Sequence, residues 1–489
     1  MDKDKNNIKK GPILNNTSYN FTARDSLGIE GVFSTLSGEI CPVVTTVTPR
    51  AFYWPFLIWL YYDYHKYSTD EEKNRTGFIR HLRRQDYFFV LSVLLSGTDE
   101  KNLVGKQQSL IDIQENPEGP YPYNDEYFKI ELGGMNYYYS GCVSMRLIWE
   151  KNMDDDTQYS FPKLSPLGEE LAHSFEKMIN ETSYYKEYRW SNSPVPRDVL
   201  EEYGRIIRLD LDGFEDARNV LKKALFEQSQ NYKLIESSDY LYSLVTQGDL
   251  EELSTSDLRQ ILFDYEFPDH KEVNVADGFK TISREWEIVV GREYFTLGLE
   301  MIWKHMMNCL DGILSADEWI RRSVDSSEFS WSDDKTIGEF LNDCSLPFAE
   351  REKTIYDAQK NRNVNKTIEN GIKLMLSIYN RFAENKDYEE QSDLFRYGMD
   401  SDSISMYEFF VSVKGNIDTP IQEFLCFVMK EWLIQKHYRT AFEKMLQKRD
   451  GFFYQVIDGK YMKKYDFQID FQEIRLRQLF QVMKDLKMI

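Results

Sequence analysis

The sequence predicts a mainly α (α+β), multi-domain helical protein with small winged-helix-like β-hairpin elements. Apolar residues recur three and four positions apart along most of the 489 residues, which places them on one side of a helix. Hydrophobic residues make up 42% and aromatic residues 15%, so the chain can build a core and is not globally disordered. The spacing predicts helices over 78–95, 166–179, 199–207, 214–226, 295–310, 368–382 and 421–446.

Residues 25–67 are predicted to form a helix, an extended connector and an aromatic helix. The first helix starts at Asp25 or Ser26, whose side-chain oxygen accepts the free amide hydrogens of a first turn, and it ends at Gly38. From Pro42 onward the chain is expected to be extended. Proline has no amide hydrogen, and the β-branched residues that follow it lose rotamer freedom in helices.

The aromatic helix begins after Pro49, because proline is a favoured first helical residue. Arg50 is interpreted as structural: it lies along neighbouring aromatic rings or anchors a carboxylate elsewhere in the domain. Tyr53 and Trp59 are grouped with it as structural or partner-contact residues. The apolar run is too short for a bilayer crossing and is flanked by Arg50 and Asp63, so no membrane association is expected.

Short β-strands are predicted where aromatic or β-branched residues meet turns. One such strand is residues 128–132. Residues 452–457 and 461–465 are predicted to pair as a hairpin. The Asp458-Gly459 dipeptide between them favours the primed turn whose twist matches that of paired strands.

Two segments have the element order of a winged helix, in which helices carry a small hairpin. The first runs from a helix at 136–149 through an acidic loop to a helix at 164–179. The second runs from a helix at 422–447 through the predicted hairpin to a helix at 471–486. Element order alone does not establish DNA binding, since the same order builds structural and protein-binding modules.

Charge restricts where nucleic acid can bind. The net charge of −21 and the pI near 4.9 oppose a broad nucleic-acid-coating surface, because phosphate binding depends on clustered Lys and Arg. Residues 431–489 differ from the rest, with 12 Lys or Arg against 8 Asp or Glu. The residues expected to contact nucleic acid are Lys460, Lys463, Lys464, Arg475 and Arg477. The alternative interpretation is an ordinary solvated surface.

Three stretches carry distinctive motifs. They are the opening with Leu27-Gly28, Pro42, Thr48, Arg50-Ala51-Phe52-Tyr53, Phe56 and Trp59, the segment HLRRQD at 81–86, and the segment LSPLGEELA at 164–172. Together they resemble an uncharacterised family of bacterial proteins whose genes lie in anti-phage defence islands. The resemblance implies a role in antiviral defence beside an ATPase, helicase or nuclease encoded nearby. It supplies no catalytic residues.

The HLRRQD segment also places basic side chains on one helical turn. Arg83 and Arg84 are able to contact phosphate, but acids such as Asp86 can neutralise them. We therefore interpret Arg83 and Arg84 as structural or partner-facing residues.

The sequence contains no established catalytic, metal or cofactor motif. Residues 104–109 lack the upstream glycine and the hydroxyl residue directly after lysine that a phosphate loop needs. Residues 210–216 lack the ligand register of a calcium loop. The six histidines are scattered, and no serine lies in a GxSxG elbow. No catalytic residue, metal site or cofactor is therefore predicted.

Cysteine spacing and composition indicate compartment and domain organisation. The five cysteines are widely separated without a CxxC pair, which favours a reducing cytoplasm over a disulfide framework. No secretory signal is recognised at the N-terminus. The expected ranges are a flexible tail at 1–24, an N-terminal helical domain with a winged-helix-like end at 25–183, a helical middle domain at 197–390 and a C-terminal helical, winged-helix-like domain at 405–489.

Two classes of function fit these observations. The first is a non-catalytic subunit of a bacterial defence complex that docks an ATPase, helicase or nuclease and contacts nucleic acid. The alternative is a metal-dependent nuclease or toxic effector whose dispersed site is invisible in linear motifs. Chelation of the metal would abolish the activity of a protein of the second class. A protein of the first class would lose only its assembly with a partner.

Overall fold

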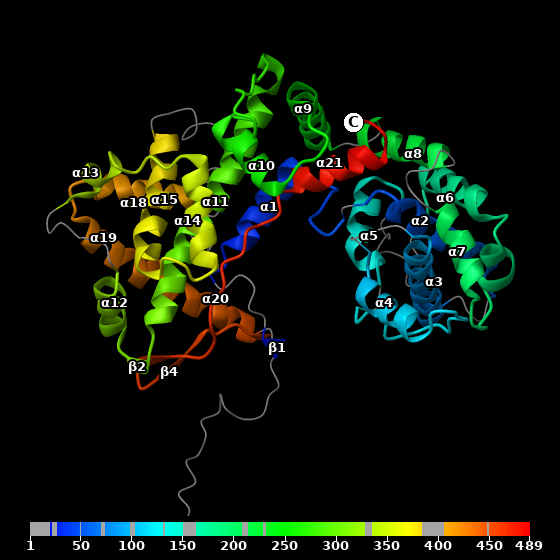
Figure 1. The fold of residues 1–489 in the computed structure, drawn as a ribbon, viewed down its shortest axis with the longest axis horizontal. Helices are drawn as coiled ribbons and strands as arrows, with labels where there is room; N and C mark the ends of the chain where they lie inside the picture. The colour runs from blue at the N-terminus through cyan, green and yellow to red at the C-terminus, as the bar shows by residue number, and fades with distance from the viewer. Residues whose placement is uncertain are drawn as a thin grey trace, which may run out of the picture. The chain divides into compact units, whose positions relative to one another are not determined.

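Helices dominate the described part of the chain (Figure 1), which confirms the predicted mainly α fold class. The computed structural model describes residues 20–21, 27–48, 50–69, 74–97, 103–130, 133–149, 163–207, 214–227, 231–327, 335–383, 405–446 and 449–489. Among the described helices, none combines the length and the apolar character that crossing a bilayer requires.

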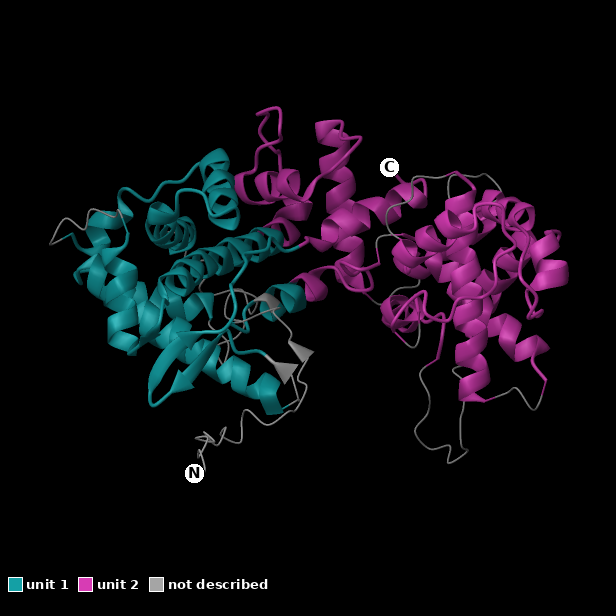
Figure 2. Ribbon diagram, turned by 60° about the horizontal axis from the view of Figure 1, so that its bottom comes forward, with its two compact units in different colours: residues 1–36, 285–472 teal, residues 37–284, 473–489 magenta. Residues whose placement is uncertain are grey.

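The chain divides into two compact units (Figure 2). Unit 1 consists of residues 1–36 and 285–472, and unit 2 consists of residues 37–284 and 473–489. Each unit is therefore assembled from two separate stretches of the sequence.

These units cut across the ranges expected from composition. The predicted C-terminal domain at 405–489 is divided between them, because residues 473–489 belong to unit 2. Compact units need not coincide with regions that fold separately. The three predicted domains, at 25–183, 197–390 and 405–489, therefore stay a prediction. Within the predicted tail at 1–24, strand β1 (Asn20–Phe21) pairs in parallel with β3 (Arg449–Asp450).

In its described residues, the regular secondary structure of unit 2 consists of helices and isolated β-bridges. Two helices, α1 (Glu30–Ile40) and α11 (Lys280–Cys309), contain the boundaries between the two units. The other helical elements of unit 2 are α2 (Tyr53–Tyr67), α3 (Arg75–Leu95), α4 (Lys106–Glu115), α5 (Met135–Ser144), α6 (Pro166–Ile179), η2 (Tyr184–Tyr188), α7 (Arg197–Ile206), α8 (Glu215–Lys222), η4 (Lys223–Glu227), α9 (Tyr232–Gly248), α10 (Thr255–Arg259), η5 (Gln260–Asp264), η6 (Asp277–Phe279) and α21 (Arg475–Asp485).

Helix α2 is the centre of an aromatic core in unit 2. Its residues are buried on nearly every side of the helix, as expected of a helix that is apolar all round. The ring of Phe56 stacks on Phe89 of α3 with centroids 4.0 Å apart. Trp59 lies 5.5 Å from Phe175 of α6. The aromatic sequence of this helix is thus explained by burial between α3 and α6.

The first winged-helix-like segment has its two helices and a short strand pairing between them. Ile148 and Leu164 form an antiparallel bridge, and Trp149 N–H donates to Lys163 O at 2.9 Å. Ser165 then caps α6 by accepting from Gly168 N–H at 3.0 Å. The acidic loop between the bridged residues lies outside the described part of the chain.

The connector predicted to be extended from Pro42 onward is instead turned. Val43 has a φ of 73°, and Thr48 N–H donates to Thr45 O at 3.0 Å.

Two other local predictions are also wrong. Gly38 does not end the first helix, because α1 continues to Ile40. A Cβ atom at Gly38 would lie 2.8 Å from Arg475 Nη2, so the glycine leaves room for close approach of the guanidinium group. Residues 128–130 of the predicted strand are not in a strand, and 131–132 lie outside the described residues, as do Asp25 and Ser26.

Unit 1 combines helices with a small sheet. Its helical elements after α11 are α12 (Ala316–Asp325), α13 (Ile337–Leu341), α14 (Phe348–Gln359), η7 (Val364–Lys366), α15 (Thr367–Ala383), α18 (Met406–Gly415), α19 (Ile421–Phe427), η8 (Val428–Ile434) and α20 (Gln435–Leu446). Its remaining strands are β2 (Ile313–Leu314), β4 (Tyr454–Ile457) and β5 (Lys460–Lys463).

The predicted C-terminal hairpin is present. Strands β4 and β5 are antiparallel, with Ile457 opposite Lys460, and β2 pairs with the other edge of β5. Asp458 and Gly459 both have positive φ, at 49° and 74°, as a primed two-residue turn requires. The dipeptide therefore sets the register of the hairpin.

Candidate partner and nucleic-acid interface

The hairpin is anchored to a module of helices in unit 1. The indole N–H of buried Trp319, on α12, donates to Met306 O at 2.6 Å. The Trp319 ring lies 5.8 Å from Tyr454 and 5.7 Å from Tyr461. The Tyr454 hydroxyl donates to Ile434 O at 3.0 Å. These contacts hold the sheet against α11, α12 and η8.

His437 joins α20 to the first residues of the hairpin. Its side chain is fully buried, and its Nε2 accepts a hydrogen bond from Phe453 N–H at 3.1 Å. Its ring lies 5.1 Å from Trp303. Because Nε2 serves as an acceptor, His437 positions the hairpin and is not available to a ligand at that atom.

The strand order of this module is that of a winged helix. Strand β2 pairs with β5, and β5 pairs with β4, so the first strand of the sheet lies beside the third. Helix α12 follows β2, and the α19–η8–α20 helix precedes β4. Residues 326–420 separate the two helices in sequence, and the predicted closing helix, α21, belongs to unit 2. The strand order thus matches that of a winged helix, but the predicted order of helix, hairpin and closing helix over 422–486 does not form one module, because its closing helix lies in unit 2.

The lysines expected to contact nucleic acid lie on and after strand β5. Lys460 is exposed beside the turn. Lys463 pairs with Asp466 at 3.1 Å, which reduces its local positive charge. The ammonium of Lys464 lies 4.9 Å from the centroid of the Tyr465 ring. Lys460 is the best placed of the three for phosphate.

The two arginines of the same predicted set belong to unit 2. Arg475 donates from Nη1 to Val44 O at 3.1 Å and to Cys41 O at 3.4 Å. Burial lowers the pKa of Arg475 below its usual value. Arg477 is exposed and pairs with Glu473 at 3.3 Å. Arg475 is therefore a structural arginine in this conformation, whereas Arg477 stays on the surface.

An exposed aromatic surface lies on α20. Tyr438, Phe442 and Leu446 are 47%, 41% and 70% exposed, and each is four residues from the next, so they share one helical face. Tyr438 stacks on Phe442 at 6.3 Å and contacts Phe452 at 5.9 Å. We call Tyr438, Phe442, Leu446 and Phe452 the α20 patch. Its four-residue spacing is visible in the sequence, but spacing does not distinguish an exposed face from a buried one.

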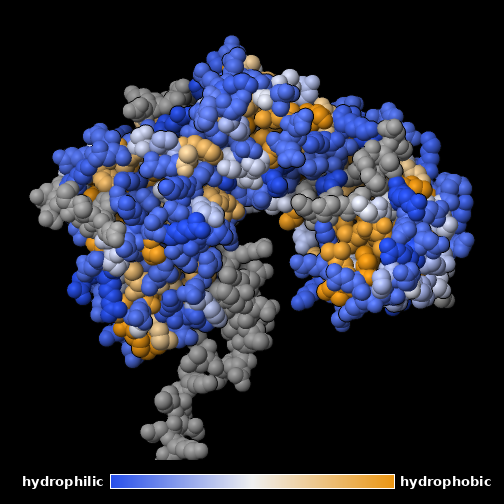
Figure 3. Space-filling view, in the orientation of Figure 1, coloured by the Kyte–Doolittle hydropathy of each residue, from blue (hydrophilic) through white to orange (hydrophobic). Residues whose placement is uncertain are grey.

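The sheet adds further exposed apolar side chains in unit 1. Ile313 is 49% exposed, Val456 is 49% exposed and Ile457 is 38% exposed. In the space-filling view, orange atoms gather at the lower left, where β2 and β4 lie (Figure 3). Isolated apolar residues on a surface are common, but a gathered group is typical of a contact surface.

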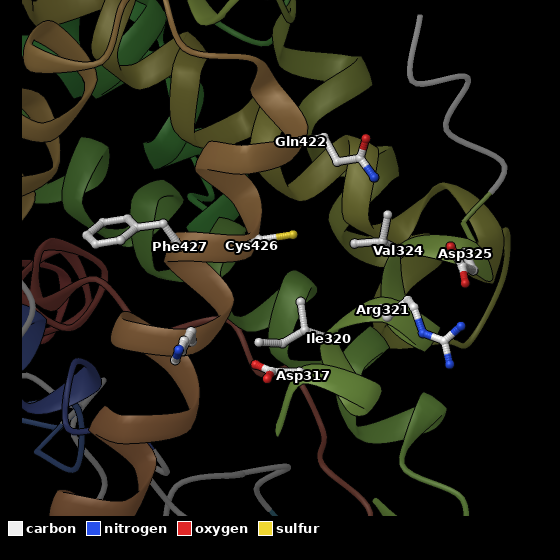
Figure 4. A pocket seen from close by; sticks show the side chains of 9 residues that line it. Asp317, Ile320, Arg321, Val324, Asp325, Gln422, Cys426 and Phe427 are labelled. Carbon is white, nitrogen blue, oxygen red and sulfur yellow. The ribbon is translucent and has the colours of Figure 1, made fainter. Parts of the chain in front are cut away.

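A groove of about 370 Å³ lies between α12 and the α19–η8 helix (Figure 4). Cys426 points toward Val324 across it, whereas the Phe427 ring points away. Its charged residues are two acids and two bases, namely Asp317, Asp325, Arg321 and Lys430. An apolar floor with a balanced charged rim can receive a protein side chain but contains no arrangement typical of a catalytic site.

The residues predicted as structural in the aromatic helix are held inside unit 2. Arg50 Nε lies 3.1 Å from Asp485 Oδ2, and the same oxygen accepts from Ala51 N–H at 2.9 Å. The Tyr53 hydroxyl accepts from Val104 N–H at 3.0 Å, and Trp59 is fully buried. Arg50 therefore anchors a carboxylate that is distant in sequence.

Arg83 and Arg84 are also directed inward. Arg83 donates to Ile130 O at 2.6 Å and to Phe128 O at 2.8 Å, and its Nε lies 3.1 Å from Asp125. Arg84 donates to Tyr188 O at 3.2 Å. Burial lowers the pKa of Arg84. Both guanidinium groups satisfy backbone carbonyls, so their role in this unit is structural.

The sequence does not reveal a buried ionic cluster in unit 2. Asp63 is fully buried, with one oxygen 3.0 Å from Arg189 Nη1 and the other 3.3 Å from His81 Nε2. The ring of Trp190 stacks on His81 at 4.2 Å, and the Arg189 guanidinium lies 3.7 Å from the Tyr185 ring centroid. The cluster stabilises the packing of α2, α3 and the segment after η2.

Comparisons with known proteins add no functional assignment. No group of three or more His, Cys, Asp or Glu residues in the described ranges is arranged to hold a metal ion. Searches of protein-family models, curated proteins and solved structures found no match to this chain.

Proposed function

We propose that this chain is a non-catalytic subunit of a bacterial anti-phage defence complex and that unit 1 docks a protein partner through the α20 patch. The observation that carries the proposal is the single helical face with Tyr438, Phe442 and Leu446 exposed. The defence setting is supported by the sequence motifs, and the partner class is an ATPase, helicase or nuclease.

The chemistry of α20 favours a protein partner over nucleic acid as the main ligand of this helix. Aromatic side chains are enriched in the centres of protein interfaces, where charged residues are depleted. Beside the patch, α20 exposes Arg439 and Glu443, which are opposite in charge. A helix that reads DNA needs a net positive face, because phosphate attraction supplies much of the affinity.

Nucleic acid has a secondary place in this proposal. Lys460, Lys463 and Lys464 lie at the hairpin and would contact phosphate once the complex is assembled. Because Lys463 already pairs with Asp466, we expect this contact to be weak and sensitive to salt.

The proposal is tested by recovering the tagged chain from cells that express it with its native gene neighbours. We expect stoichiometric recovery of an ATPase, helicase or nuclease with the unmodified chain, measured by mass spectrometry and size-exclusion chromatography. Phe442→Glu is expected to lower recovery of that partner at least about tenfold, because a buried charge without a partner is costly at an interface.

Two control variants make the result specific. Tyr232→Glu changes a 65% exposed aromatic residue of unit 2 and should retain the partner. Lys460→Glu combined with Lys463→Glu should retain the protein partner but weaken retention of nucleic acid. Recovery of the chain alone, or equal recovery with the Phe442 and Tyr232 variants, would contradict docking through the α20 patch.

A further inference from the structure

Three polar side chains meet at the C-terminal end of α11 in unit 1. His305 and Cys309 are four residues apart on α11, and Ser326 follows α12. The Cys309 Sγ atom lies 3.1 Å from Ser326 Oγ, and His305 Nε2 lies 3.0 Å from the same oxygen. Cys309 is half-buried, and His305 is 2% exposed. The cluster thus has a partly accessible sulfur with a buried imidazole behind it.

Hydrogen-bond geometry favours a positive charge on His305. Its Nδ1 lies 3.1 Å from Val364 O, and its Nε2 lies 3.0 Å from Ser323 O. Carbonyl oxygens only accept, so both ring nitrogens can be satisfied as donors when the imidazole is protonated. The position near the C-terminus of α11 also stabilises a cation, although it disfavours an anion on Cys309.

Ser326 connects the ring to the sulfur. Its hydroxyl has one hydrogen, which can be donated to Cys309 Sγ at 3.1 Å or to Ser323 O at 3.2 Å, while its oxygen accepts from His305 Nε2–H. Such an arrangement favours a thiolate over a thiol, because the negative sulfur gains an O–H donor and a neighbouring imidazolium.

The protonation behaviour of the pair agrees with this geometry. Burial alone would raise the pKa of Cys309, but the hydrogen bond and charge of His305 and the serine hydroxyls lower it below its ordinary value. Burial alone would lower the pKa of His305, but Cys309 and the carbonyls of Val364 and Ser323 raise it. The charged residues nearest to the cluster in sequence are Lys304 on α11, Asp311 just after it, Arg321, Arg322 and Asp325 on α12, and Lys366 in η7.

The other four cysteines differ from Cys309. Burial raises the pKa of Cys41 and of Cys344 to about 12, and it raises the pKa of Cys142 further. Cys426 is also half-buried, and burial together with Glu423 raises the pKa of its thiol. Cys426 is therefore an internal reference of similar exposure without an imidazole partner.

We propose that Cys309 is a modification site of this protein, a thiolate held by His305 and Ser326 that reacts with hydroperoxides. The sulfur attacks one peroxide oxygen, the O–O bond breaks, and the leaving oxygen takes the proton that His305 holds. With hydrogen peroxide, the products are a sulfenic acid at Cys309 and one water molecule. The sulfur loses two electrons and the peroxide gains them.

The first test measures alkylation of the native full chain by iodoacetamide across pH 5 to 10, with peptide mass spectrometry of Cys309 and Cys426. At pH 7 we expect Cys309 to react at least about tenfold faster than Cys426, since the thiolate is the reacting form. The alkylation rate of Cys309 should reach its plateau at a lower pH than the alkylation rate of Cys426. Equal rates with overlapping pH profiles would overturn the proposal.

Variants distinguish reactivity that depends on His305 and Ser326 from reactivity that depends only on the exposure of the sulfur. His305→Gln should slow Cys309 alkylation at pH 7 about tenfold and move its pH profile upward. Ser326→Ala, on the surface, should move the profile in the same direction and keeps the test informative if the His305 variant does not fold. His270→Gln, at an exposed histidine of unit 2, should leave the profile unchanged.

The second test adds hydrogen peroxide and then dimedone, which traps sulfenic acid. We expect a dimedone adduct on Cys309 in the unmodified chain and slower adduct formation in Ser326→Ala. Absence of an adduct on Cys309, or formation at the same rate on Cys309 and Cys426, would overturn the assignment of hydroperoxide as its reactant.

Discussion

Two regions of the molecule use their side chains differently: the cluster around Asp63 in unit 2 buries charge, whereas the α20 patch in unit 1 exposes apolar rings. In unit 2, the Asp63 carboxylate is completely buried against Arg189 and His81. In unit 1, Phe442 is 41% exposed on the face of α20 that also carries Leu446. Buried charges require partners, so they restrict the structure. Exposed aromatic rings can still be buried against another protein. The difference separates residues that maintain the fold from residues available to a partner.

The largest effect on stability is expected from Asp63→Asn. The substitution keeps the shape of the side chain but removes the charge facing Arg189, which should cost about 3 to 5 kcal/mol of unfolding free energy, as for other broken buried pairs. Chemical denaturation followed by circular dichroism measures it. Asp216→Asn, which breaks the exposed pair with Lys177, is the matched control and should leave the midpoint unchanged. Similar midpoints for both variants would show that the buried cluster is not structural.

A second effect of the buried charges depends on pH. Burial raises the pKa of Asp86 to about 6, although Tyr127 O–H at 2.7 Å and Gly134 N–H at 2.9 Å donate to it and oppose the rise. The folded state therefore binds this proton more tightly than the unfolded state. The stabilisation is fully present below pH 4 and is lost as the pH rises through about 6.

The pH effect is isolated by comparing the unmodified chain with Asp86→Asn. The difference in unfolding free energy between the two proteins should change by on the order of 3 kcal/mol between pH 4 and pH 7. The unmodified chain becomes less stable relative to the variant as the pH rises. Denaturation curves at several pH values provide the measurement. Parallel curves for the two proteins would mean that Asp86 does not titrate in this range.

The smallest effect on stability is expected in the α20 patch. Phe442→Ala should change the unfolding free energy by less than about 1 kcal/mol, because the ring is already partly in water. Phe453→Ala, at a ring of unit 1 that is 1% exposed, should cost about 3 to 5 kcal/mol. Thermal unfolding of both variants checks the contrast. A large loss with Phe442→Ala would make the patch part of the core.

The sequence predicts those parts of the fold that depend on neighbouring residues. The aromatic helix α2 and the turn at Asp458-Gly459 follow from local spacing and local backbone preference. The prediction at Gly38 is wrong because α1 continues to Ile40, and the glycine lies instead beside the guanidinium of Arg475, which is more than 400 residues away. Local rules cannot include such a contact.

The candidate sites were less predictable for the same reason. His305 and Cys309 have helical spacing, but Ser326 and Val364 reach them from other elements. Likewise, Arg475 reads as a surface cation in a basic segment, and only the fold brings it to the carbonyls of Cys41 and Val44. Charge counts describe a segment and do not reveal which of its side chains are buried.

The composition of unit 2 has a consequence for protein synthesis. Helix α21 supplies Asp485 to Arg50, yet residues 285–472 of unit 1 are translated between these two partners. Domains generally fold as units while the chain emerges from the ribosome. The ion pair between Arg50 and Asp485 can therefore form only after residues 285–472 of unit 1 have been synthesised.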